Sequence, residues 1–109
     1  MASIDEFRNL DLRVGVITGV EDHPTARKPM YKLEVDLGSE LGKRTVVAGI
    51  KNSYTREELL GKKVICVANL EPKSVAGIES QGMLLAAEDS GVISLLTIDR
   101  DLPQGSAVR

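Results

Sequence analysis

Polar side chains suited to binding a ligand gather in one stretch of the sequence, residues 69–87, NLEPKSVAGIESQGMLLAA. An apolar run over residues 64–68 leads into it, and apolar patterning resumes at Met83. In small β domains, a polar loop between two core strands is a common binding surface, although plain surface connections are polar as well. Amide, hydroxyl and ammonium groups there would bind through hydrogen bonds and charge. Four residues are the candidate contacts: Asn69, Lys73, Ser80 and Gln81.

Positive charge is concentrated in the middle of the chain. The net charge of −2 argues against a protein that binds any polyanion without selectivity. Residues 27–73 nevertheless carry ten lysines and arginines against six acidic residues. This distribution allows a local basic face, and an ordinary solvated surface is the alternative. Four cations are candidates for phosphate contacts: Lys28, Arg44, Lys51 and Lys73.

Residue types needed for catalysis or for a metal centre are scarce. His23 is the only histidine and Cys66 the only cysteine, so one chain can assemble neither a zinc site nor a nucleophile with a histidine base. The acidic residues are scattered, and no glycine-rich phosphate loop is present. The sequence therefore predicts a binding protein with no catalytic residues, no metal site and no cofactor.

Nucleic acid is the ligand class that these residues favour, with one restriction. Proteins that hold single strands stack the bases on aromatic side chains, and this chain has only Phe7, Tyr31 and Tyr54. A folded RNA, recognised by its shape, its phosphates and its 2′-hydroxyl groups, suits the composition better. Cations would then contact phosphates, and the polar loop would supply neutral hydrogen bonds.

Capping signals and alternating apolar residues predict the elements that position these candidates. Two capping boxes, each a hydroxyl residue followed three positions later by Glu, predict short helices over residues 4–9 and 55–61. The first should turn Phe7 inward, and the second should bury Leu59 and Leu60. Alternation predicts the strands, at residues 11–20, 31–37, 44–48, 63–68, 82–87 and 92–98.

This order of elements predicts an all-β fold in one domain, residues 1–109. We expect a five-stranded Greek-key barrel of the OB type, with one short helix between the third and fourth strands and another at the N-terminus. A two-sheet sandwich is the alternative. Gly15 and Gly19 should mark a bend or bulge in the first strand. The C-terminal tail could pack either on its own barrel or on a second subunit.

Signals for the cellular compartment favour the cytoplasm. No apolar run approaches the roughly 18 residues of a membrane span, and the N-terminal sequence MASIDEF lacks the features of a secretion signal. Cys66 lies within an apolar run, which favours a buried, unreactive thiol in a reducing compartment. We therefore expect a cytoplasmic protein that does not associate with a membrane.

The polar loop also resembles a known family. Similarity extends from residues 69–87 to the segments DLRVGVITGVEDHPTA (11–26), VAGI (47–50), EELLGKKV (57–64) and LPQG (102–105). The family is the tRNA-binding domain, found as a free homodimeric protein, in methionyl-tRNA synthetases or their beta subunits, and in the endothelial-monocyte-activating-polypeptide group. This resemblance implies an OB fold, a homodimer and binding of tRNA by its folded shape. It also implies a methionyl-tRNA synthetase as a further partner.

Two motifs border the RNA site in the family pattern, an Asn-Leu-x-Pro turn and a Ser-x-Gly-Met sequence. On this chain they place Asn69, Ser80 and Met83 at the site, with Lys73 and Gln81 beside them. Met83 by itself looks like a core residue. The resemblance makes it a rim contact, and core packing is the alternative.

One segment departs from the usual family form. Residues 26–38, ARKPMYKLEVDLG, are one residue longer and resemble the CsaA branch, homodimeric relatives described as secretion chaperones that bind unfolded polypeptides. That branch typically lacks the Ser-Gln-Gly-Met sequence, which is intact at residues 80–83. Because the chain combines both signatures, binding of unfolded polypeptide is the alternative function, and the role of Lys28 depends on which signature prevails.

Overall fold

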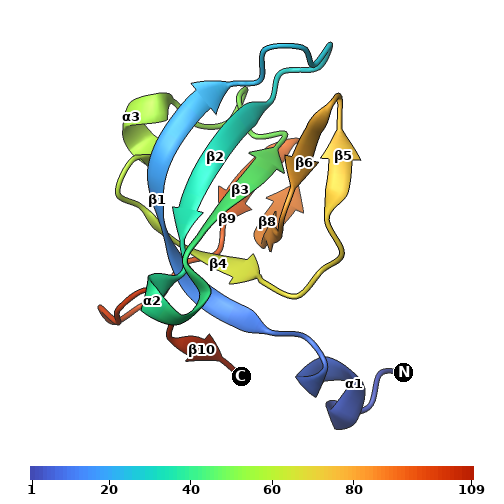
Figure 1. Ribbon diagram of the computed structural model, residues 1–109, viewed down its shortest axis with the longest axis vertical. Coiled ribbons are helices and arrows are strands. Elements are labelled where there is room, and N and C mark those ends of the chain that lie inside the picture. Colours follow the sequence, from blue (N-terminus) through green and yellow to red (C-terminus); the bar gives the residue numbers. More distant parts are fainter.

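Antiparallel strands form most of the regular secondary structure in the computed structural model, which describes residues 1–109 (Figure 1). Three short helices accompany them, and none is long and apolar enough to cross a membrane. In chain order the elements are α1 (Ile4–Arg8), β1 (Leu12–Asp22), β2 (Tyr31–Asp36), α2 (Gly38–Leu41), β3 (Lys43–Ala48), α3 (Arg56–Leu59), β4 (Lys63–Val67), β5 (Lys73–Val75), β6 (Ile78–Ser80), β7 (Met83–Leu84), β8 (Ala86–Asp89), β9 (Val92–Leu95) and β10 (Ala107–Val108).

Five strands form the barrel, in the spatial order β3, β2, β1, β4 and β7. β1 pairs antiparallel with β4 through its first half and with β2 through its second half. The ring is joined between β3 and the segment before β7 by the side chains of Ser80 and Gln81, which bond to the backbone of β3. α3 follows β3 and precedes β4 in the chain, and it lies beside β1 at upper left in Figure 1. The predicted OB-type barrel, with its helix after the third strand, is therefore confirmed.

Alternation along β2 gives the core that the sequence predicts. Tyr31, Leu33, Val35 and Leu37 are all buried inside the barrel. Because side chains of a strand alternate between its two faces, the intervening residues of β2 point away from the core.

β1 contributes to two apolar clusters because it is bent. Its register against β2 shifts between Ile17 and Gly19, which confirms the predicted irregularity at Gly19. At Gly15 the pairing with β4 is regular. Ile17 and Val20 face the barrel core, whereas Leu12 and Val14 belong to a smaller cluster outside it. One long strand thus supports both the barrel and the packing of the chain ends.

The helices form where the capping boxes predict them. In both, the N-cap hydroxyl accepts from the Glu backbone N–H, and the Glu side chain accepts from the N-cap N–H. α3 buries Leu59, but Leu60 is exposed because the helix ends before it. The inward orientation predicted for Phe7 is wrong as well: α1 projects from the barrel, and Phe7 is 40% exposed (Figure 1).

Two connections carry structure that the sequence patterns do not indicate. α2 occupies the turn between β2 and β3, and the polar loop contains the β5–β6 hairpin. The predicted strand over 82–87 is divided into β7 and the start of β8, and β9 ends at Leu95.

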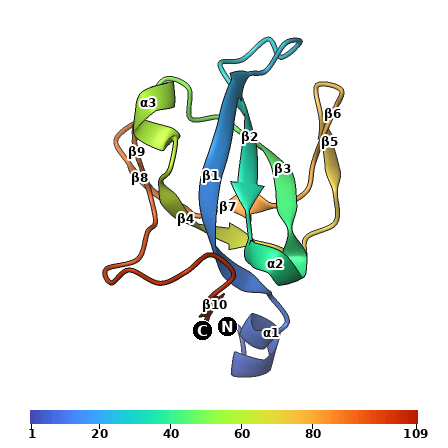
Figure 2. The same ribbon diagram turned by 60° about the vertical axis from the view of Figure 1, so that its left-hand side comes forward.

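The C-terminal tail packs on its own barrel, the first of the two predicted positions. β10 pairs with the start of β1, with Val108 opposite Leu12. The segment that precedes β10 is held to the barrel by Lys63, whose Nζ donates to the Asp101 carboxylate and to the carbonyl of Leu102. Figure 2 shows this segment on the side of the barrel away from the β5–β6 hairpin.

Candidate nucleic-acid interface

Ser80 and Gln81 form a seam that closes the barrel against β3. The N–H of Thr45 donates to Gln81 Oε1 at 2.9 Å, and the N–H of Gln81 donates to the Thr45 carbonyl at 2.7 Å. The N–H of Val47 donates to Ser80 Oγ at 3.0 Å. Side chains therefore take the place of the carbonyls that a regular strand would present. The Nε2 of Gln81 donates to no group of the protein, so it is free for a ligand.

Arg44 and Gly82 complete the seam. Arg44 Nη1 donates to the carbonyl of Ala68 at 2.9 Å and to that of Gln81 at 3.3 Å. Gly82 passes so close to β4 that a Cβ there would lie 3.0 Å from the sulfur of Cys66. The Ser-Gln-Gly sequence thus supplies two side-chain acceptors followed by a residue that needs no side-chain space.

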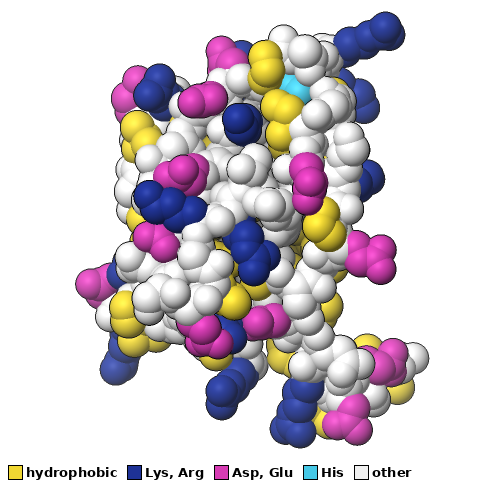
Figure 3. Space-filling model, in the orientation of Figure 1, with side chains coloured by type: hydrophobic (Ala, Val, Ile, Leu, Met, Phe, Trp, Pro, Cys, Tyr) yellow, Lys and Arg dark blue, Asp and Glu magenta, His cyan; other side chains and the backbone are white.

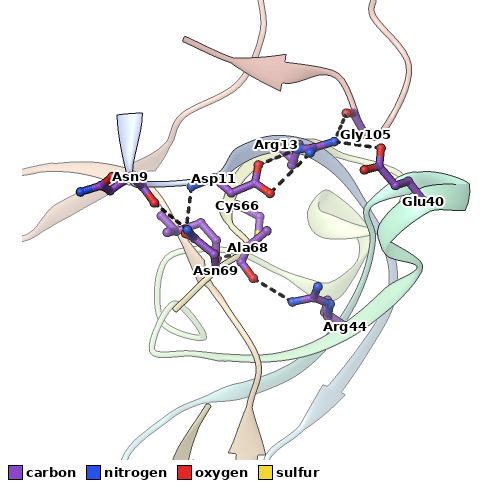
Figure 4. A network of polar contacts seen from close by, with 10 residues as sticks. Asn9, Asp11, Arg13, Glu40, Arg44, Cys66, Ala68, Asn69 and Gly105 are labelled. Atoms are coloured by element: carbon purple, nitrogen blue, oxygen red, sulfur yellow. Dashed lines mark hydrogen bonds and ion pairs between the residues drawn. The ribbon is translucent and has the colours of Figure 1, made fainter. Parts of the chain in front are cut away.

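Asn69 fastens the N-terminal segment to the end of β4 (Figure 4). Its Oδ1 accepts from the N–H of Asp11 at 2.8 Å, and its Nδ2 donates to the carbonyl of Asn9 at 2.6 Å. Beside it, Arg13 pairs with Asp11 at 2.6 Å and with Glu40 at 3.6 Å. The hydrogen bond that Arg13 donates to the Asp11 carboxylate raises the pKa of the guanidinium. The oxygen and the nitrogen of the Asn69 side-chain amide are thus both bonded within the protein.

The remaining predicted contacts lie on the surface. Lys28 and Lys73 are exposed, and neither takes part in any of the five ion pairs. Lys51 is also exposed, but its Nζ lies 3.0 Å from a carboxylate oxygen of Asp22. Met83 is 49% exposed, so its side chain is accessible to a partner as well as in contact with the barrel.

A mixed charge pattern covers the strands themselves. Lys43 lies 3.4 Å from Glu34 on the neighbouring strand. A hydrogen bond from Thr18 and the charge of Lys43 lower the pKa of Glu34, which favours the charged pair. Figure 3 shows basic and acidic side chains interspersed over this face, with basic side chains alone at the loop tip at upper right. Of the four candidate cations, Lys28 and Lys51 lie on loops, Arg44 lies in β3 and Lys73 begins β5.

The loop of residues 23–30 and the β5–β6 hairpin meet at one end of the barrel (Figures 1 and 2). His23 Nε2 lies 2.8 Å from the carbonyl of Val75, and Thr25 Oγ1 donates to the carbonyl of Ala76 at 2.7 Å. Between them is a hollow of about 320 Å³. We name this region the loop edge; the hollow is lined by Thr25, Ala26, Arg27, Lys28, Met30, Val75 and Ala76.

The sequence did not indicate that His23, Thr25 and Arg27 contribute to the loop edge. His23 is 8% exposed, and one of its partners, the carbonyl of Val75, lies on a hairpin about half the chain away. The one signal was the position of a histidine and an arginine in the same non-periodic loop as Lys28.

An apolar groove of about 550 Å³ lies at the opposite end, between α1 and β10. Ile4 is 60% exposed, Phe7 40% and Leu10 43%. α1 has only five residues and buries none of them. A helix this short is unstable in water without packing. Any partner that packed in this apolar groove would therefore stabilise α1.

The chemistry of the single cysteine agrees with the prediction of an unreactive thiol. Cys66 is fully buried and free. Burial raises the pKa of its thiol, which keeps it protonated and poorly nucleophilic. Its sulfur packs behind the seam, next to Gly82.

Comparison with known proteins gives consistent matches. The family described as "Putative tRNA binding domain" matches residues 12–107. Methionine–tRNA ligases are among the curated relatives: that of Methanococcus maripaludis strain C5 is 56% identical over 105 residues, and that of Pyrococcus furiosus is 52% identical over 107. These alignments cover 96% and 98% of the chain. The chain spans only 15% and 14% of the lengths of these two relatives.

Solved structures with the same fold come from both branches named in the sequence analysis. The CsaA chaperone protein of Picrophilus torridus is 36% identical, with a TM-score of 0.94 and complete coverage of both chains. The MetRS-related protein of Pyrococcus horikoshii is 39% identical, with a TM-score of 0.89, covering 100% of this chain and 98% of that one.

Proposed function

The chain belongs to the putative tRNA-binding domain family, and from this membership we propose that it binds folded tRNA at the loop edge and the adjoining seam. The family match over residues 12–107 carries the proposal. Recognition is largely independent of base sequence, because the cations and neutral donors contact phosphates whose arrangement is set by the folded shape of the RNA. The chain acts by binding and not as an enzyme.

The predicted contacts divide by the work that each side chain already does. Asn69 and Ser80 use their side-chain hydrogen bonds within the fold, so we propose that they shape the site from within. Arg44 uses only Nη1 within the fold, so its Nε and Nη2 can donate to phosphate. Gln81 does both, because its Oε1 closes the seam while its Nε2 is free. The direct contacts to RNA are Lys28, Lys51, Lys73 and Met83, with Arg27 beside them.

A titration that compares a folded tRNA with an unstructured RNA of equal length, at several salt concentrations, tests this function. We expect the folded tRNA to bind more tightly, and the logarithm of its affinity to fall linearly with the logarithm of salt concentration. Equal binding of the two RNAs, or no binding, would contradict the proposal.

We propose that the protein is a homodimer and that the second copy covers the α1 groove. Support comes from the three exposed apolar side chains of the N-terminal segment and from a helix that buries nothing within its own chain. Light scattering should give twice the 11.8 kDa of one chain. Phe7→Asp should give a monomer, since a carboxylate in an apolar interface is costly to desolvate. A wild-type mass near 11.8 kDa would refute the dimer.

A methionyl-tRNA ligase is the proposed further partner, and the cytoplasm, where tRNA is charged, is the proposed location. The support is that the chain aligns over nearly its whole length with part of such ligases. Adding the protein to a methionyl-tRNA ligase that lacks this domain should lower the KM for tRNA and leave kcat unchanged. An unchanged KM would remove the ligase as a partner.

Binding of unfolded polypeptide is the second candidate function. The match to the CsaA chaperone protein over both complete chains favours it, and the α1 groove offers an apolar surface. The protein would then suppress aggregation of an unfolded client, and a peptide, but not tRNA, would compete. Suppression that tRNA abolishes would instead place both ligands at one site.

A further inference from the structure

His23 makes hydrogen bonds through both ring nitrogens, and all of its partners are backbone groups. Its Nδ1 accepts from the N–H of Thr25 at 3.1 Å and from that of Ala26 at 3.0 Å. Since two donors face Nδ1, this nitrogen must carry the lone pair. The proton is then on Nε2, which donates to the carbonyl of Val75 at 2.8 Å. The geometry requires a neutral imidazole in a single tautomer.

The imidazole therefore joins two segments that are distant in the sequence. Through Nδ1 it shapes its own loop, and through Nε2 it holds the β5–β6 hairpin. Thr25 Oγ1 adds a second link, to the carbonyl of Ala76. Together these two bonds form a clasp, and they are the only hydrogen bonds between residues 23–30 and the hairpin.

The hairpin needs such support. Its ladder is three residue pairs long, and an isolated two-stranded hairpin of this size is marginally stable in water. Ala76 and Gly77 form its turn with φ of 48° and 90°, the positive values that a two-residue hairpin turn requires. The carbonyls of Val75 and Ala76 at this turn are the ones that His23 and Thr25 contact. Ser80 anchors the opposite end to β3, so the clasp is what fixes the tip.

We propose that His23 is a positioning residue for RNA binding: it locks the 23–30 loop to the β5–β6 hairpin and so holds the cations of both segments in one arrangement. The inference rests on the proposed function and deepens it. Arg27 and Lys28 are on the loop, and Lys73 lies at the base of the hairpin, opposite Ser80. The clasp therefore places the two loop cations relative to a hairpin base that Ser80 already anchors to the barrel. A rigid arrangement costs less conformational entropy when a folded RNA binds.

Protonation of His23 opens the clasp. A proton on Nδ1 would face the two backbone N–H groups that it now accepts from, so the loop must rearrange. No charged group hydrogen-bonds or ion-pairs with the imidazole. The charged residues of the elements around it are Arg27 and Lys28 on its own loop, Glu21 and Asp22 with Lys51 on the β1 side, and Lys73 and Glu79 on the hairpin.

The direction of the pH effect separates the clasp from ordinary electrostatics. Acidification normally strengthens binding to RNA, because the protein gains positive charge. Opening of the clasp has the opposite effect. We expect the wild-type affinity for tRNA to fall about fivefold once acidification protonates His23.

Two substitutions of His23 divide its bonds. His23→Asn retains an acceptor near the Nδ1 position, which keeps the loop but removes the link to Val75. His23→Gln retains a donor that reaches the Nε2 position, which keeps the link. At neutral pH we expect His23→Asn to bind tRNA about fivefold more weakly than wild type and His23→Gln to lie between them. Neither variant should lose affinity on acidification.

Controls distinguish this inference from a general loss of fold. Thermal unfolding checks each variant, and Thr25→Val removes the second link without touching the imidazole. As His23 is the only histidine, its ring nitrogens give unambiguous NMR signals, which should show the neutral tautomer with the proton on Nε2. A proton on Nδ1 at neutral pH overturns the inference.

The remaining outcomes separate this inference from the proposed function. Wild-type protein that binds tRNA at neutral pH while His23→Asn binds equally well, with the same pH profile, overturns the clasp alone. Tighter binding by His23→Asn than by His23→Gln does the same, since it would make the shape of the loop decisive. Wild-type protein that does not bind tRNA at all overturns both the clasp and the proposed function.

Discussion

Gln81 offers the sharpest separation of folding from binding, because two substitutions divide its roles. Gln81→Ala removes the acceptor for the N–H of Thr45, which then loses its partner in a half-buried seam. An unsatisfied donor of this kind costs about 1–3 kcal/mol. Water reaches the half-buried seam, so we expect the lower end, about 1 kcal/mol, and a fall in Tm of about 4–8 °C.

Gln81→Glu is the matched variant, since it keeps an oxygen at the position that accepts from Thr45. The guanidinium of Arg44, which donates to the carbonyl of residue 81 at 3.3 Å, lies near the new charge. The free energy of unfolding should therefore stay within about 0.5 kcal/mol of wild type. The free amide donor is lost, however, and a negative charge replaces it. We expect tRNA affinity to fall about fivefold, the effect of roughly 1 kcal/mol for unit charges about 4 Å apart in water.

Urea denaturation and a tRNA titration on both variants test this reasoning. If Gln81→Glu destabilises the protein as much as Gln81→Ala, the hydrogen bond to Thr45 does not account for the seam. If Gln81→Glu binds tRNA as wild type does, Gln81 lies outside the RNA site and acts only in the fold.

Three further predictions concern charge, packing and pH. Lys73→Glu should weaken tRNA binding and reduce the salt slope by about 1, whereas Arg100→Glu, in the segment between β9 and β10, should change neither. Equal effects of the two substitutions would leave only net charge as the cause. Gly82→Ala should lower the free energy of unfolding by about 1–3 kcal/mol, because its Cβ would lie 3.0 Å from the sulfur of Cys66; unchanged urea denaturation would contradict this close approach. The hydrogen bond from the N-cap threonine lowers the pKa of Glu58 below its usual 4.5, so its contribution is present above that pH and is lost as the pH falls through the lowered pKa. Glu58→Gln should reduce the loss of stability on acidification, and denaturation curves across pH 3 to 7 with the wild-type slope would contradict this.

Features that depend on neighbours in the sequence could be predicted well. Both capping boxes need only residues three positions apart, and both form as expected. The core face of β2 follows from alternation, because each side chain points opposite to the next. The predictions that Phe7 and Leu60 are buried were wrong for a common reason. The apolar pattern of a short helix indicates an apolar surface but does not show what covers it.

Long-range partners explain most of what the sequence could not predict about the candidate site. Ser80 and Gln81 looked like free polar groups, but their partners on β3 lie 33 and 36 residues away. Asn69 bonds to backbone about 60 residues away, and His23 to a hairpin 52 residues away. No local pattern encodes such contacts, so residue type predicted the surface cations better than it predicted the side chains that position them.

The most direct measurement is the mapping of tRNA on the protein by NMR, with isotope-labelled wild-type protein and a folded tRNA. The account predicts that backbone amide signals of the 23–30 loop, the β5–β6 hairpin and residues 80–83 change most. Signals of the tail that follows β9, on the other side of the barrel, should stay in place. Changes confined to α1 and β10, with the loop edge unaffected, would contradict the central claim.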